Sequence, residues 1–102
     1  MAITTQHFQT INGFSNLFYG WGGEDDDLYF RVSQAELSVV RFEKNVAKYK
    51  MLRHEKEIPN PSRFATMKKN KIIHATEGLN SLNYTILSYE LKSLYTWMFV
   101  HL

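Results

Sequence analysis

The sequence has no cysteine, only two prolines, and no aspartate outside positions 25 to 27. Without cysteine, neither a disulfide framework nor thiol chemistry is available in these 102 residues. No apolar run approaches the roughly 18 residues of a membrane-spanning helix, and the first residues lack the pattern of a signal peptide. Taken alone, the sequence is that of a soluble chain, and any targeting segment would have to lie outside it.

A large excess of positive or negative charge is also missing. The formal net charge of +2 is too small to argue for a nucleic acid or an anionic membrane as partner. The only basic cluster spans residues 68–71, and a solvated helix face explains it without a partner. The hydrophobic share of 44% and the charged share of 22% are typical of a small globular domain, and the length allows one at most.

The aspartates that are present lie together. Asp25, Asp26 and Asp27 follow directly after Trp21, two glycines and Glu24. An aromatic ring beside four carboxylates is suited to a sugar, because the ring offers a flat apolar face, the acids bind hydroxyls, and one acid can accept a proton. The alternative is a helix N-terminus, where acids interact favourably with the helix dipole. The tryptophan and glycines next to the acids favour the sugar site over a simple helix cap.

Hydrophobic spacing and breaker residues predict a chain of helices, loops and strands. Helices are expected at residues 4–11, 24–35 and 63–76, the last capped by Ser62 after the Pro-Asn-Pro stretch. Residues 14–23 read as a loop. Strands are expected at residues 39–42, 49–54, 83–89 and 94–102. The fold class expected is therefore α/β, with a mixed sheet and helices.

Two further pairs are weak when taken alone. Met51 and His54 are three residues apart, so on a strand they would point to opposite faces and would not share a metal ion. Arg63 and Phe64 could frame a small polar ligand, or could simply begin a helix after a stiff loop.

The motifs together closely resemble the signature of the β-1,4-galactosyltransferases, in order and over nearly the whole chain. The most specific block is Trp-Gly-Gly-Glu-Asp-Asp-Asp at residues 21–27. The other matching blocks occupy residues 11–16, 49–54, 59–64, 78–82 and 94–96.

The resemblance implies the carboxy-terminal half of a GT-A catalytic domain, with residues 1–102 forming its acceptor and metal part. The expected enzyme is a type II membrane protein of the Golgi lumen, whose anchor lies outside this chain. It would transfer galactose from UDP-galactose to O4 of a terminal N-acetylglucosamine or glucose, with inversion and with Mn²⁺.

The resemblance also assigns roles to residues. Asp25 matches the catalytic base, Glu24 and Asp26 match acids that hold the sugars, and Met51 and His54 match two of three manganese ligands. The stretch of about 52–65 resembles a lid over bound donor. The remaining residues expected to bind donor or acceptor are Trp21, Gly22, Gly23, Arg63, Phe64 and Met67.

The chain also departs from the family pattern. The family's Asp-x-Asp metal motif has no counterpart here, because no aspartate lies outside residues 25–27. We therefore expect the 102 residues alone to be inactive. A non-catalytic sugar-binding or interaction module is the alternative, and a structural helix cap is the third reading.

Overall fold

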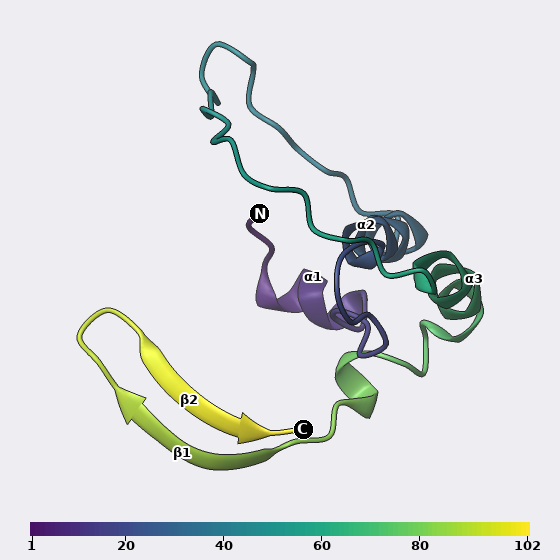
Figure 1. The fold of residues 1–102 in the computed structure, drawn as a ribbon, viewed down its shortest axis with the longest axis vertical. Coiled ribbons are helices and arrows are strands. Elements are labelled where there is room, and N and C mark those ends of the chain that lie inside the picture. Colours follow the sequence, from purple (N-terminus) through teal and green to yellow (C-terminus); the bar gives the residue numbers. More distant parts are fainter.

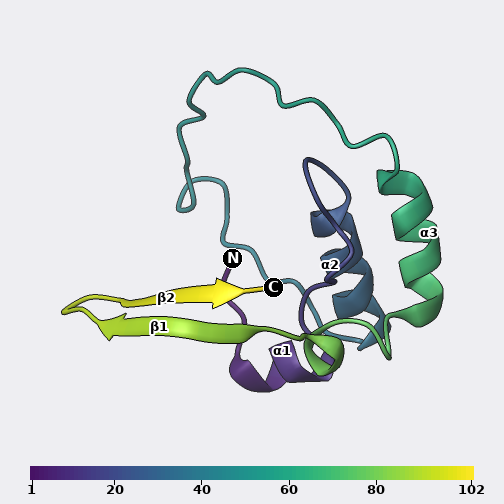
Figure 2. The same cartoon turned by 60° about the horizontal axis from the view of Figure 1, so that its bottom comes forward.

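The computed structural model describes all 102 residues and contains three helices and a hairpin. The elements in chain order are α1 (Thr5–Thr10), α2 (Glu24–Gln34), α3 (Arg63–Ile73), a short 3-10 helix (Leu79–Ser81), β1 (Thr85–Leu91) and β2 (Thr96–His101). The helices lie together, the hairpin extends to one side, and the chain between α2 and α3 makes a long excursion (Figures 1 and 2). No helix is both long and apolar enough to cross a bilayer.

Helix α1 forms where the sequence predicts it. The Thr4 side chain accepts a hydrogen bond from the backbone N–H of His7 at 3.1 Å, which caps the first turn. Asn12 and Gly13 then turn the chain with φ of 59° and 64°. Residues with positive φ cannot continue a right-handed helix, so the predicted break is confirmed.

Helix α2 confirms the predicted helix at residues 24–35, and all four acids lie in its first turn. It begins after Gly23, whose left-handed backbone (φ 100°) turns the loop into the helix. Of its predicted apolar face, Leu28 is buried, whereas Val32 and Ala35 are partly exposed.

Helix α3 is also where the sequence places it, but two details were wrong. It ends at Ile73 and a turn follows, so the predicted end at residue 76 was too late. The Ser62 hydroxyl does not cap the helix; it donates instead to Asn60 Oδ1 at 2.7 Å. A serine that bonds locally within a turn cannot also serve the helix N–H groups.

The two predicted strands form an antiparallel hairpin. Strand β1 keeps the predicted length but lies two residues later than 83–89, and β2 is three residues shorter than the predicted 94–102. Thr85 pairs with His101 and Leu91 with Thr96, with an irregularity between Ile86 and Ser88. Both faces of the hairpin are exposed to solvent.

The strands predicted at residues 39–42 and 49–54 do not form. The chain from residue 38 to residue 59 is exposed throughout and makes only one isolated bridge, between Trp21 and Pro59. A strand needs a partner for its N–H and C=O groups, and no neighbouring strand reaches this stretch. Strand-forming composition was therefore insufficient evidence for a strand.

The interior is small and largely polar. Ile11 and Leu28 are the only buried apolar side chains. Four charged or amide side chains are also buried: Asp27, Arg31, Asn70 and Glu77. Every buried polar side-chain atom has a hydrogen-bond partner. A satisfied polar cluster, rather than an apolar core, therefore occupies the centre of the helical part.

Candidate functional site

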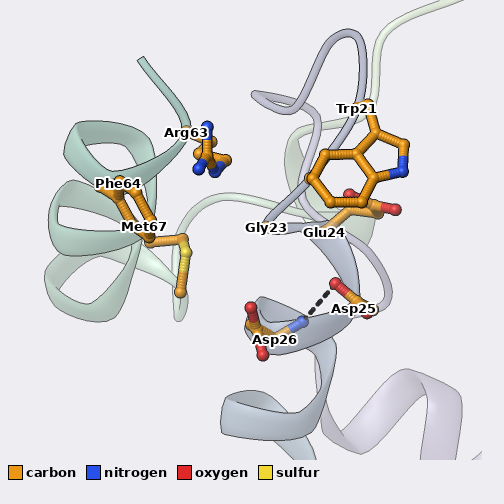
Figure 3. Close-up of a pocket in the computed structure, with 9 residues that line it drawn as sticks. Trp21, Gly23, Glu24, Asp25, Asp26, Arg63, Phe64 and Met67 are labelled. Carbon is orange, nitrogen blue, oxygen red and sulfur yellow. Dashed lines mark hydrogen bonds between the residues drawn. The ribbon is translucent and has the colours of Figure 1, made fainter. Parts of the chain in front are cut away.

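A cavity of about 280 Å³ opens between the N-terminal ends of α2 and α3 (Figure 3). It is lined by the loop before α2, the first turn of α2 and the first turns of α3. The lining residues are Trp21, Gly22, Gly23, Glu24, Asp25, Asp26, Arg63, Phe64 and Met67. These are the residues expected from the sequence to act as base or to bind donor and acceptor. The structure thus brings together two groups far apart in the chain, although their roles stay predictions.

The glycines of the loop allow its close approach to α3. Gly22 has φ 105°, and a Cβ there would lie 3.0 Å from Arg63 Cδ. Gly23 has φ 100°, and its Cβ would lie 2.9 Å from Phe18 and 3.3 Å from Met67. A side chain at either position would meet both backbone strain and its neighbours. The close approach of this turn to α3 therefore explains why both positions are glycine.

Asn60 fastens the same loop from the other side. Its backbone N–H donates to Trp21 O at 3.0 Å, and its side-chain amide donates to Tyr19 O at 2.7 Å. Arg63 Nη1 donates in turn to Asn60 O at 3.2 Å. The sequence indicated only a stiff Pro-Asn-Pro loop here, so this link between the Trp21 loop and the start of α3 was missed.

The acidic wall consists of exposed side chains on the first turn of α2. Glu24, Asp25 and Asp26 are all accessible to solvent, and Asp25 Oδ1 accepts the backbone N–H of Asp26 at 3.0 Å (Figure 3). Their carboxylates lie near the unpaired N–H groups of the helix start, which interact favourably with negative charge. These acids are free to meet a hydroxyl-rich ligand.

The opposite wall combines a positive charge with apolar surface. The Arg63 guanidinium carbon lies 4.3 Å from the centre of the Phe64 ring, within the range of a cation–π contact. Met67 completes this wall one turn further along α3 (Figure 3). A cavity with acids on one side and an aromatic, cationic wall on the other can hold a polar ring such as a sugar.

Asp27 differs from the other acids of its run because it is only 3% exposed. Its carboxylate accepts from Arg31 Nε at 2.8 Å and from Asn70 Nδ2 at 2.6 Å. It therefore does not face the cavity. The spacing of four between Asp27 and Arg31 on a helix was a signal for this ion pair that the sequence reading passed over.

A second and larger cavity, of about 540 Å³, lies on the other side of Asp25. Its walls are mostly apolar and come from residues 1–4, the outer face of α2 and residues 37–41. Asp25 lines both cavities, so it stands at the boundary between a polar and an apolar space.

The residues expected to bind manganese lie apart from this site. Met51 is 90% exposed, His54 is exposed, and neither lines the cavity. No cluster of three or more His, Cys, Asp or Glu side chains in the chain could hold a metal ion. His54 Nδ1 lies 2.8 Å from Glu55 O, which fits a ring whose other nitrogen remains available as a ligand. A metal site at Met51 and His54 therefore stays a prediction.

Comparison with known proteins finds one matching family model and several similar proteins. A sequence model of a family, described as the N-terminal domain of galactosyltransferase, matches residues 1–55. Beta-1,4-galactosyltransferase 1 of Bos taurus is 43% identical over 98 residues, which cover 93% of this chain and 24% of the relative. For the Homo sapiens protein of that name the identity is 42%, with 93% and 25% covered. Beta-1,4-galactosyltransferase 5 of Mus musculus is 46% identical over 86 residues, or 82% of this chain and 22% of the relative.

The chain thus spans about a quarter of the length of these relatives. The matching family model is described as an amino-terminal domain, whereas the resemblance led us to expect the carboxy-terminal half of a catalytic domain. Its position within the longer proteins stays a prediction.

Proposed function

Because the chain belongs to the β-1,4-galactosyltransferase family, we propose that it forms part of an inverting galactosyltransferase. The complete enzyme would move galactose from UDP-galactose to O4 of a terminal N-acetylglucosamine or glucose, on a GT-A domain. The observation that carries the proposal is the convergence of nine expected residues around one cavity between α2 and α3.

Asp25 is the proposed catalytic base. It lies at the cavity wall on the first turn of α2 with its side chain exposed, so an acceptor hydroxyl can reach its carboxylate. Taking the proton as the hydroxyl attacks the galactose carbon is general-base catalysis, which contributes about 10²–10⁴-fold to rate. Glu24 and Asp26 flank it and would hold sugar hydroxyls.

The aromatic and apolar residues would orient the sugars and limit water. Trp21 is 53% exposed on the glycine-rich loop, so its ring is available to cover a bound sugar. Phe64 and Met67 supply apolar surface for the acceptor and Arg63 supplies a hydrogen-bond donor. The stretch of about 52–65, of which residues 52–59 are exposed, is the proposed lid.

Met51 and His54 would supply two ligands of a manganese ion, with the third from outside this chain. Such an ion offsets the charge that develops on a departing diphosphate. A thioether and an imidazole are an incomplete set for a hard cation, and the chain has no group of three His, Cys, Asp or Glu side chains that could hold one. We therefore propose that the 102 residues alone are inactive. By its family, we further propose that the complete enzyme works in the Golgi lumen from a membrane anchor.

Substituting the proposed base tests the assignment. In the complete enzyme, Asp25→Asn should lower kcat about 10²–10⁴-fold in a radiolabelled galactose transfer assay, because the amide cannot accept the proton. Glu43→Gln, at an exposed acid outside the cavity, is the matched control and should retain normal turnover. Near-normal kcat in Asp25→Asn would leave the catalytic assignment without support.

A second candidate is a non-catalytic sugar-binding module. It is favoured by the exposed Trp21 ring, the Phe64 ring and the exposed acids at the cavity, since these groups can bind a sugar without catalysing a reaction. Titrating the chain with N-acetylglucosamine while following tryptophan fluorescence separates the two: saturable binding without galactose transfer in the complete protein supports the module.

A further inference from the structure

We propose that the buried cluster of Asp27, Arg31, Asn70 and Glu77 sets the separation of the two cavity walls, with Asp27 and Asn70 as positioning residues. The catalytic consequence of this inference rests on the proposed function. The geometric part concerns only the two helices and can be measured without it.

The cluster lies directly behind both walls. Asp27 follows Asp25 and Asp26 on α2, and Asn70 comes three residues after Met67, on the same side of α3. Asn70 Nδ2 donates to Asp27 Oδ1 at 2.6 Å and so joins the two helices one turn away from the cavity. Both side chains are almost fully buried, at 3% and 0% exposed.

Arg31 makes the arrangement a network. Its Nε donates to Asp27 at 2.8 Å, and its Nη2 donates to Asn70 Oδ1 at 3.4 Å and to Glu77 Oε2 at 3.0 Å. Glu77 in turn accepts the backbone N–H of Asn16 at 2.6 Å. The network therefore ties together α2, α3, the loop after α1 and the turn after α3.

Apolar packing between the two helices is sparse, apart from the edge contact of Phe30 on α2 with His74 at the end of α3. The only buried residue of α3 is Asn70, and the only buried apolar residue of α2 is Leu28. Because a shift of one helix would leave a buried charge or amide without its partner, the network favours one discrete spacing. Charges and amides, rather than shape, thus fix the distance between the acidic wall and the Arg63 wall.

Direct measurement of that distance tests the inference. The chain has no native cysteine, so the substitutions Tyr29→Cys and Lys68→Cys create the only two sites for spin labels. Both positions are exposed, one on α2 and one on α3. In the full 102-residue chain, Asn70→Ala should broaden or shift the distance distribution between the labels. A control, Phe30→Leu, weakens the Phe30–His74 edge contact (5.2 Å) towards the other end of α2 and should leave the distribution unchanged.

Exchanging the two groups gives the decisive variant. The pair Asp27→Asn with Asn70→Asp keeps one amide and one carboxylate across the interface, and Arg31 donates to both positions. The double variant should restore the original distribution that each single variant disturbs, even where a single variant fails to fold. Failure of the exchange to restore it, or equal disturbance by Phe30→Leu, would overturn the inference.

Galactose transfer by the complete enzyme supplies the second readout. Asn70→Ala should lower kcat/KM for the acceptor about 100-fold, since misplacing a wall by about 1 Å has effects of that size. The exchange should recover most of it, and Phe30→Leu, compared at equal Tm, should not lose it. If the distances respond but the unsubstituted enzyme transfers no galactose, the proposed function fails while the positioning role stands. If transfer is normal in Asn70→Ala, the positioning role fails.

Discussion

The helical part of the chain and the part formed by the excursion and the hairpin are held in different ways. In the first, buried hydrogen bonds join α2, α3, the loop after α1 and the turn after α3, and the N-terminal ends of α2 and α3 form the cavity with the loop before α2. In the second, residues 38–59 and both faces of the hairpin are exposed, with only local hydrogen bonds and strand pairing. The residues proposed to bind the sugars lie on the first part, whereas Met51 and His54, the proposed metal ligands, lie on the second.

The difference shows what fixes a site in so small a chain. With two buried apolar side chains, hydrophobic packing cannot order the whole molecule. The cavity lies where buried polar partners constrain the backbone, whereas Met51 and His54 lie on a stretch without such partners. Substitutions in the two regions should therefore differ in how much they lower the free energy of unfolding.

The largest effect is expected at the centre of the helical part. Arg31→Met leaves Asp27 and Glu77 buried without their shared partner, which should reduce the free energy of unfolding by about 3–5 kcal/mol. Lys92→Met is the matched control, because it removes the cation of the exposed Lys92–Glu90 pair on the hairpin and should change stability by about 0–1 kcal/mol. Urea denaturation followed by circular dichroism measures both, and equal losses would contradict the comparison.

An intermediate effect is expected at the loop that meets α3. Gly23→Ala combines positive φ with a clash against Phe18, and should reduce the free energy of unfolding by about 1–3 kcal/mol. At Gly20 the φ is also positive (72°), but a Cβ there would lie 3.8 Å from its nearest neighbour. Gly20→Ala should therefore show only the backbone component, of about 1 kcal/mol. A smaller loss in Gly23→Ala than in Gly20→Ala, measured by thermal unfolding, would show that the close approach is not tight.

The smallest effect on stability is expected in the exposed excursion. His54→Ala removes no buried contact and should leave the free energy of unfolding within about 0.5 kcal/mol of its original value. In the complete enzyme, however, it should raise the Mn²⁺ concentration needed for half-maximal transfer, since a ligand is lost. His74→Ala, outside the predicted metal set, is the control for the metal titration. An unchanged Mn²⁺ requirement in His54→Ala would remove His54 from the metal site.

Local signals predicted the elements that satisfy their own backbone or find a nearby partner. Thr4 and the Asn12–Gly13 break bounded α1, the spacing of Leu28 and Val32 indicated α2, and the hairpin followed from two neighbouring extended segments. The strands at residues 39–42 and 49–54 could not be judged in this way, because a strand depends on a partner elsewhere. Ser62 was read as a cap because the competing bond to Asn60 is invisible in a linear pattern.

The residues that line the candidate site were predicted, but the hydrogen bonds that hold them in place were not. Resemblance to the family supplied the nine residues, and the structure places all of them at one cavity. Asn60 and Asn70 were missed as parts of the site, since an asparagine in a loop and one in a helix carry no pattern of their own. Their importance comes from partners 39 or more positions away in the chain, as the bonds to Tyr19 and Arg31 illustrate.

The sequence by itself determined the helix starts, the turns, the chemistry concentrated at residues 21–27 and the family, because these depend on residue types and short spacings. Only the tertiary structure decided that Asp27 is a buried link while its neighbours face a cavity. Four adjacent acids look alike in the chain, and helix geometry together with the positions of Arg31 and Asn70 separates them.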